Sequence, residues 1–90
     1  MMADESTESA AELASHSATK PYETRAKQIL KGELKRRGIT YAELAERLTA
    51  KGAKESERNL ANKISRGSFT AAFFMMCMDA IGVHDLSLET

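Results

Sequence analysis

The chain has 90 residues, of which 42% are hydrophobic and 29% are charged, and its 13 basic residues balance its 13 acidic residues. This length allows one domain with a modest core. No segment approaches the roughly 18 apolar residues that a membrane span needs, and the acidic N-terminus lacks the basic-then-apolar order of a signal peptide. The single cysteine, Cys77, excludes an internal disulfide and fits a reducing compartment. We therefore expect a soluble, cytoplasmic protein.

The charges are distributed unevenly along the chain. Residues 1–19 carry four acidic residues and no Lys or Arg, residues 20–67 carry all 13 basic residues against six Glu, and residues 68–90 carry three acidic residues. The middle segment therefore has a formal charge of +7, an asymmetry expected where one surface meets a polyanion. Helices with lysine-rich surfaces and no such partner give the same count, so the charge alone leaves both interpretations open.

The N-terminal segment, residues 1–19, is small, polar and acidic, with Leu13 as its sizeable apolar residue after two methionines. Such a segment buries too little surface to offset the entropy lost on ordering. We predict a disordered acidic tail over residues 1–19 and a folded helical domain over residues 20–90. Pro21 suits a position near the start of the first helix.

The first helix is predicted over residues 22–37, because apolar residues recur there at three- and four-residue steps: Tyr22, Ala26, Ile29, Leu30 and Leu34. Three lysines lie four residues apart on the opposite face: Lys27, Lys31 and Lys35. Glu33 and Arg37 have the spacing of an intrahelical ion pair. Gly38 is predicted to end the helix, since glycine adopts the left-handed conformation without steric cost.

The second and third helices carry clear start and stop signals. Thr40 is the predicted N-cap of the second helix and forms a capping box with Glu43. This helix is predicted to end by Gly52. The third helix is predicted over residues 56–65 and ends before Gly67, a second glycine suited to a helix end.

The fourth helix is predicted from an N-cap at Thr70 to residue 81, and its residues 71–78 are apolar nearly all round. The core needs only part of this set: Phe73, Met76, Cys77, Ala80 and Ile81. Exposed apolar patches usually mark an interface. We therefore predict that the remaining side chains form a dimer interface: Phe74, Met75 and Met78.

No arrangement of residues suggests catalysis. His16 lies in the acidic tail and His84 follows the last helix, so they share no common scaffold. Metal-ligand spacings are absent, and the apolar neighbours of Cys77 are expected to raise the pKa of its thiol. We predict a protein that is not an enzyme, with no catalytic residue, metal, cofactor or small-molecule substrate.

The segment between Thr40 and Gly67 has the parts of a DNA-reading helix-turn-helix: a capped helix, a glycine-containing connection and a second helix with polar side chains. Asn suits bidentate contact with adenine and Arg with guanine, which predicts three base-reading residues: Arg58, Asn59 and Asn62. Phosphate contacts, the largest source of affinity, are predicted for five cations: Lys35, Arg36, Lys54, Lys63 and Arg66. Asn59 and Asn62 are equally consistent with ordinary helix-surface positions.

Residues 24–83 resemble the Cro/phage-repressor-like helix-turn-helix domains through the stretches LKRRGITYAELAERL and NLANKISRGSFTAAFFMMCMDAIGV. This resemblance implies an all-α, four- or five-helix repressor-like bundle that binds double-stranded DNA as a homodimeric bacterial transcription regulator. In addition, RRGITYAELAERL combined with RNLANKISRGSFTAAFF is similar to a small bacterial family classed as a domain of unknown function, which implies no activity.

The chain departs from the repressor pattern at two places. Six more residues lie between Leu44 and Gly67 than in the tight motif, and such an insertion is expected to lengthen the turn and tilt the recognition helix. Ser65 stands where many repressors have Glu. Both changes are compatible with the fold, but they affect whether the recognition helix can enter the major groove of DNA.

The rival interpretation is a non-enzymatic protein-interaction or adaptor module that docks through the apolar surface of the last helix. In that case the basic middle segment has no role in binding. RNA binding ranks last, because the chain lacks the exposed stacking aromatics that single strands prefer.

Overall fold

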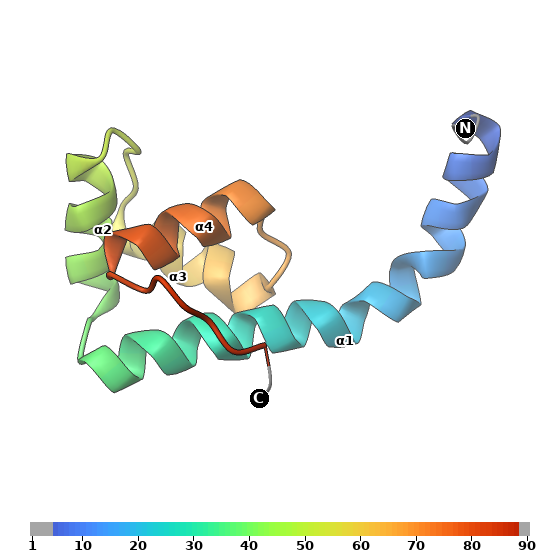
Figure 1. Cartoon of the computed structure of the whole chain (residues 1–90). Coiled ribbons are helices and arrows are strands. Elements are labelled where there is room, and N and C mark those ends of the chain that lie inside the picture. The colour runs from blue at the N-terminus through green and yellow to red at the C-terminus, as the bar shows by residue number, and fades with distance from the viewer. Residues whose placement is uncertain (1–4, 89–90) are drawn as a thin grey trace.

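The computed structural model describes the backbone of residues 5–88 and the side chains of residues 18–88. Within that part the chain forms four helices and no strand: α1 (Glu5–Arg37), α2 (Tyr41–Ala50), α3 (Glu57–Arg66) and α4 (Ala71–Ala80). The predicted all-helical fold is confirmed. Helices α3 and α4 each contact both α1 and α2, and α2 stands across one end of the bundle while α1 runs along its base (Figure 1).

Helix α1 starts earlier than the sequence pattern predicts. It begins at Glu5, and Pro21 lies inside it rather than at its first position. A proline within a helix removes one backbone hydrogen bond and crowds the preceding turn, so it bends a helix without having to end it. Residues 1–4 lie outside the described residues and residues 5–17 are described by their backbone alone, so the disorder predicted for residues 1–19 stays a prediction.

Each short helix begins at a hydroxyl side chain. The hydroxyl oxygen accepts a hydrogen bond of 3.0–3.1 Å from the backbone N–H three residues later, and the capping residues are Thr40, Ser56 and Thr70. Such caps satisfy backbone donors that a helix start otherwise leaves unpaired. The caps predicted at Thr40 and Thr70 are confirmed, whereas Ser56 precedes the third helix instead of belonging to it.

The core lies between the four helices and draws on all of them. Its fully buried large side chains are Leu30, Leu44, Leu48, Leu60, Ile64 and Cys77. Each aliphatic side chain of this size contributes about 1.5–3 kcal/mol when it is removed from water. The small core thus ties every helix of the bundle to the others.

Met78 belongs to this core, and its predicted place in an exposed dimer interface is wrong. Its side chain is 4% exposed. The chain turns back after α4, and the N–H of the buried residue Val83 donates to the Met78 carbonyl oxygen at 2.9 Å. The inward face of α4 therefore includes Met78, while Met76 is only partly buried at the edge of the core.

The C-terminal end of α3 is held directly against α1. Gly67 ends α3 in the left-handed conformation, with φ +73°, and a Cβ atom placed on it would lie 2.8 Å from the carbonyl oxygen of Glu23. One turn along α1, the Nζ of Lys27 donates to the Ser65 carbonyl oxygen at 3.2 Å. Both contacts place the end of α3 on the backbone of α1.

Replacing Gly67 with alanine should destabilise the fold more than the same change at Gly38. Both glycines have positive φ, but a Cβ at Gly38 meets nothing within 4 Å. We expect Gly38→Ala to cost about 1 kcal/mol from backbone strain alone, and Gly67→Ala to cost about 3 kcal/mol because steric overlap adds to that strain. Denaturant unfolding followed by circular dichroism measures both, and equal losses would contradict this packing.

Candidate nucleic-acid interface

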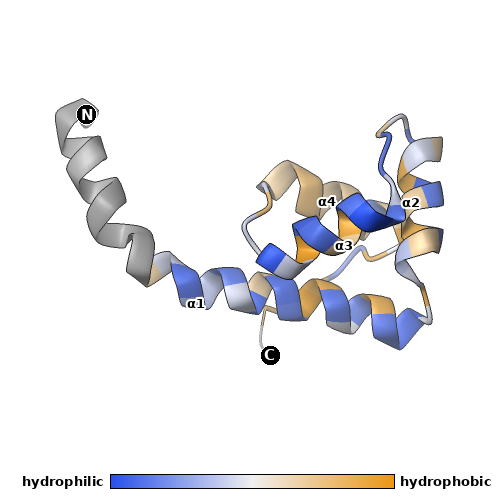
Figure 2. Cartoon of the chain, turned by 180° about the vertical axis from the view of Figure 1, so that it is seen from behind, coloured by the Kyte–Doolittle hydropathy of each residue, from blue (hydrophilic) through white to orange (hydrophobic). Residues whose placement is uncertain are grey.

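The side of α3 that points away from the bundle is polar and exposed. Leu60 and Ile64 are fully buried, whereas the residues on the opposite side of the helix are exposed: Arg58, Asn59, Asn62 and Arg66. The helical period of 3.6 residues separates the two sets. Figure 2 looks onto this helix, and much of its ribbon is hydrophilic. The structure thus brings the three predicted base-reading residues and one predicted phosphate contact onto one face.

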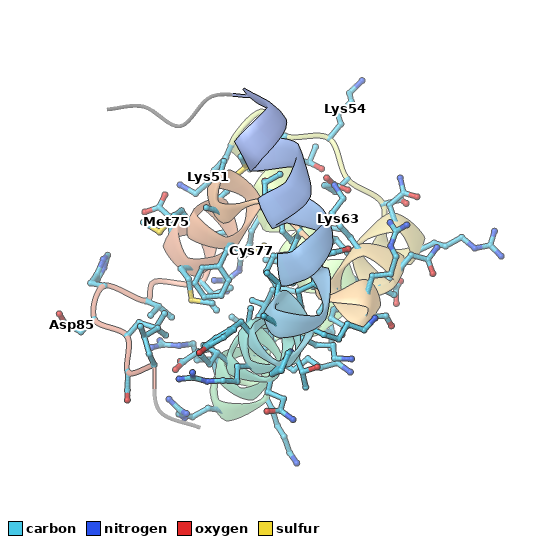
Figure 3. All side chains as sticks on the ribbon, turned by 90° about the vertical axis from the view of Figure 1, so that its right-hand side faces the viewer. Lys51, Lys54, Lys63, Met75, Cys77 and Asp85 are labelled. Carbon is cyan, nitrogen blue, oxygen red and sulfur yellow. The ribbon has the colours of Figure 1, made fainter. Side chains whose placement is uncertain are left out.

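Lys54 lies just before this face, in the connection between α2 and α3. Its side chain is exposed and extends away from the bundle, as Figure 3 shows. Because Lys54 precedes the start of α3, it adds a cation near the N-terminal end of this helix, where Arg58 also lies. Lys54 thus occupies a place consistent with its predicted contact to a phosphate.

Lys63, by contrast, makes contacts within the protein. Its Nζ lies 2.7 Å from Glu55 Oε2 and 4.8 Å from the centre of the Phe73 ring. The Glu55 side chain is only 14% exposed, so this ion pair is partly shielded from solvent. These contacts join the connection to α3 and α4. The Lys63 side chain remains 37% exposed, and its predicted phosphate contact stays a prediction. Glu55 was not predicted as a partner of Lys63, because the two residues are eight positions apart and outside any intrahelical spacing.

The connection between α2 and α3 is six residues long, from residue 51 to residue 56, which is longer than the three- or four-residue turn of a compact helix-turn-helix. Contacts hold it along its length. Lys51 Nζ lies 2.7 Å from Asp79 Oδ2 on α4, and this hydrogen bond with its charge lowers the pKa of Asp79. The N–H of Ala53 donates to the Leu48 carbonyl oxygen at 2.9 Å. The predicted insertion therefore forms an anchored connection.

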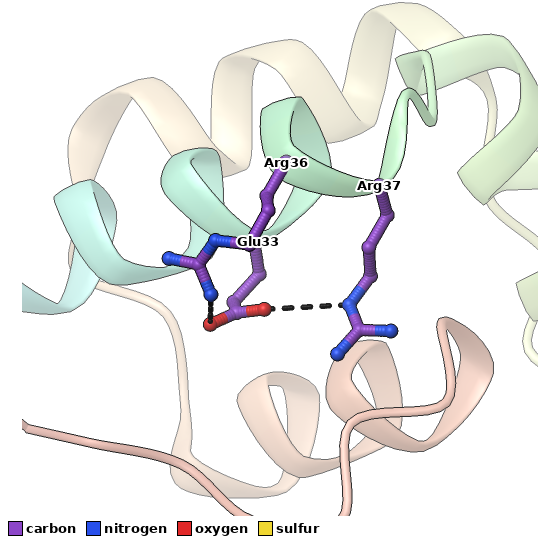
Figure 4. A network of polar contacts seen from close by, with 3 residues as sticks. All are labelled: Glu33, Arg36 and Arg37. Atoms are coloured by element: carbon purple, nitrogen blue, oxygen red, sulfur yellow. Dashed lines mark hydrogen bonds and ion pairs between the residues drawn. The ribbon is translucent and has the colours of Figure 1, made fainter.

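The C-terminal end of α1 carries an arginine pair around one carboxylate (Figure 4). Glu33 Oε2 lies 2.8 Å from Arg36 Nη1, and Glu33 Oε1 lies 3.3 Å from Arg37 Nε. The predicted Glu33–Arg37 ion pair is confirmed. The Glu33 residue is 7% exposed, while the Arg36 side chain remains 69% exposed. Arg36 therefore keeps its guanidinium at the surface, where the sequence predicted a phosphate contact.

Two lysines of α1 border a shallow depression at the junction of α1 and α2. Lys31 and Lys35 border it together with Thr40 and Tyr41. Burial raises the pKa of the Tyr41 hydroxyl, which moves its ionisation further from neutral pH. Lys35 was predicted to contact phosphate. Lys31, which the four-residue spacing places on the same face of α1, had no predicted contact.

The residues predicted to form a dimer interface do not share one exposed surface. Met75 is 65% exposed, and Figure 3 shows it on the outside of α4. Phe74 is partly buried, and its ring stacks on that of Phe69 with centroids 6.1 Å apart. With Met78 in the core, Met75 is the residue of the predicted set that keeps a largely exposed side chain.

Other kinds of site find little support in the part of the chain that the structure describes. It brings together no group of three or more His, Cys, Asp and Glu side chains that could hold a metal ion. None of its helices combines the length and the apolar character needed to cross a membrane. Burial raises the pKa of the Cys77 thiol from 9.0 to about 12, with Glu55 adding to the shift and Lys63 opposing it.

The Cys77 thiol should be nearly inert in the native protein. It is fully buried and stays protonated at neutral pH, whereas the thiolate is the reactive form. We expect a thiol-specific reagent at about pH 8 to modify it at least about 100-fold more slowly in buffer than in denaturant, because reaction requires opening of the fold. Equal rates in the two solutions would contradict the burial.

The raised pKa of Cys77 also predicts how the free energy of unfolding changes at alkaline pH. The unfolded thiol ionises at a lower pH than the folded one, so its contribution to stability is complete below about pH 9 and falls as the pH rises towards 12.

Comparison with known proteins identifies one family. Residues 22–86 match the model of a family described as a domain of unknown function (DUF6471). No curated protein and no solved structure matches the chain. The predicted similarity to a family of this kind is confirmed, and the match begins at Tyr22, within α1, and ends at Leu86, beyond α4. The resemblance to phage repressors stays a prediction.

Proposed function

We propose that this chain, which belongs to the DUF6471 family, binds double-stranded DNA through the exposed face of α3. One observation carries the proposal: two arginines and two asparagines are exposed on α3 opposite the buried Leu60 and Ile64. A polar helix face that is fixed to a small core and rich in such groups suits the major groove, which is about 12 Å wide and admits an α-helix.

In this proposal α3 supplies base contacts from its first two turns. Arg58 offers a planar pair of donors that matches O6 and N7 of guanine, and the side-chain amides of Asn59 and Asn62 match N6 and N7 of adenine. The backbone N–H of Asn59 already bonds to Ser56, so the cap fixes the start of the helix while the side-chain amide faces outward. Rigid placement of these groups favours selective readout.

Phosphate contacts are proposed for exposed cations around α3 and at the end of α1. Arg66 lies on the same face of α3, and Lys54 precedes it. Lys35 and Arg36 are exposed at the end of α1, and Lys31 joins them. Such contacts would position the duplex without reading its sequence, and the charge of +7 on residues 20–67 is consistent with this role.

A homodimer that regulates transcription in the bacterial cytoplasm is part of the same proposal. Two copies related by a twofold axis would present their α3 helices to two half-sites one helical turn apart. Met75, with its exposed side chain on α4, supports an interface there, and the partly buried Phe74 lies beside it. Met78 is left out of the proposed interface. No catalytic role or cofactor is proposed.

Binding to a mixed-sequence duplex should depend steeply on salt and on the cations named above. Each phosphate contact contributes about 0.9 to the slope of log K against log salt concentration. We expect Lys54→Ala and Arg66→Ala each to weaken binding and to reduce that slope by about 1. Fluorescence anisotropy of a labelled duplex over a range of salt concentrations measures both quantities.

A matched control removes a cation from outside this surface. The Arg47 guanidinium lies 3.0 Å from Glu43 Oε2 and donates to the Ala80 carbonyl oxygen at 3.1 Å, so it is engaged between α2 and α4. Arg47→Ala removes the same charge and should leave the salt slope unchanged. If all three variants lower the slope equally, the contribution is one of net charge and the assignment to α3 fails.

The acidic N-terminal residues are expected to weaken binding to DNA by competing for the basic face. Deleting residues 1–19 removes a charge of −4 and should tighten non-specific binding severalfold at low salt, an effect that screening suppresses at high salt. Neutralising Asp4, Glu5, Glu8 and Glu12 as amides keeps the chain length and should act in the same direction. Unchanged affinity in both variants would discard this idea.

A second candidate function, docking onto a larger protein, is favoured by three exposed large hydrophobic residues, Tyr22, Met75 and Leu88, which are 63–65% exposed. An adaptor of this kind needs no DNA. The salt titration separates the two functions, because an adaptor would show no affinity for the duplex at any salt concentration.

A further inference from the structure

A groove lies beside the bundle, between α1, the start of α4 and the C-terminal segment. Its volume is about 480 Å³, within the range of about 300–1,000 Å³ typical of sites for small ligands. Side chains from three separate parts of the chain line it, including Arg25, Ile29, Phe69, Phe74 and Leu88. None of the residues proposed to contact DNA lines this groove.

The walls of the groove are apolar. Phe69 stacks on Phe74 with ring planes 3° apart, which gives a flat aromatic wall. Tyr22 and Leu88 stand at its margin and are 65% and 63% exposed. Large apolar side chains gathered around one hollow favour an apolar occupant, because covering them removes their surface from water.

One charged side chain, Arg25, stands among the residues that line the groove. Its guanidinium carbon lies 5.6 Å from the centre of the Tyr22 ring, and its Nη2 donates to the Leu88 carbonyl oxygen at 2.7 Å. These two contacts hold the guanidinium at the edge of the apolar wall. A guanidinium carries five N–H donors in a planar fork, and this geometry matches a carboxylate.

We propose that the groove binds a small amphiphilic carboxylate, with its apolar body against Phe69 and Phe74 and its carboxylate on Arg25. Charge complementarity decides the class of ligand, since Arg25 carries the only formal charge among the described residues of the lining and the remaining described lining is mostly apolar. A fatty acid of medium chain length has this chemistry. The inference does not rest on DNA binding, because no residue proposed to contact DNA lines the groove.

The test titrates the full chain with dodecanoate below its micelle concentration and with dodecanol as an uncharged partner of equal chain length. Two-dimensional amide NMR follows the binding, and we expect the largest shifts at Tyr22, Ala71 and Phe74. Arg25→Gln should weaken dodecanoate binding about fivefold, the modest effect of a solvent-exposed ion pair, and leave dodecanol binding unchanged. Lys20→Gln, which removes an exposed cation on the same helix outside the groove, should change neither.

A second pair of variants consists of one that fills the groove and a matched control, and neither changes a core residue. Ala71 and Ala72 are both exposed at the start of α4, but only Ala71 lines the groove. Ala71→Phe should abolish dodecanoate binding, whereas Ala72→Phe should not, and thermal unfolding checks that both variants fold. Dodecanoate shifts spread over the whole protein, or binding equal in the two variants, would overturn the proposal. A third result would also overturn it: the chain does not bind dodecanoate but self-associates, and Ala71→Phe abolishes the self-association. In that case a second copy of the chain occupies the groove.

Discussion

The close approach of Gly67 to the backbone of α1 is the constraint on which the placement of α3 depends. A residue with a Cβ cannot occupy this position without displacing the Glu23 carbonyl, so α3 ends where α1 allows it to end. The buried side chains of Leu60 and Ile64 then fix the rotation of α3 about its axis. Its polar residues face outward as a consequence of packing, and any function of that face relies on this geometry.

The start of α3 is fixed by different interactions. The Lys63–Glu55 ion pair and the Ser56 cap join the long connection to the helix, and Lys51 joins the same connection to α4 through Asp79. Partly buried ion pairs contribute less to stability than to a unique arrangement in some proteins. Here the partly buried Lys63–Glu55 pair and the solvent-exposed Lys51–Asp79 pair together give the six-residue connection a fixed path.

Local signals in the sequence predicted much of this fold. The Thr40 and Thr70 caps, the Glu33–Arg37 pair and the glycine at the end of α3 each depend on residues a few positions apart, and each is present. The start of α1 was placed too late, at Pro21, and two other features depend on long-range packing. The burial of Met78 depends on the returning C-terminal segment, and the contacts of Lys63 depend on Glu55 and Phe73. Neither partner follows from helical periodicity.

The two proposed binding surfaces are chemically distinct: a polar cationic face on α3 and an apolar groove that contains Arg25. The proposed function depends on the polar cationic face of α3. Amide NMR of the chain titrated with a mixed-sequence duplex at low salt tests it most directly. If α3 and the connection before it bind the duplex, the largest shifts fall at the exposed residues proposed to contact it: Lys54, Arg58, Asn59, Asn62 and Arg66. Shifts confined to α4 and the groove, or an unchanged spectrum, would contradict it.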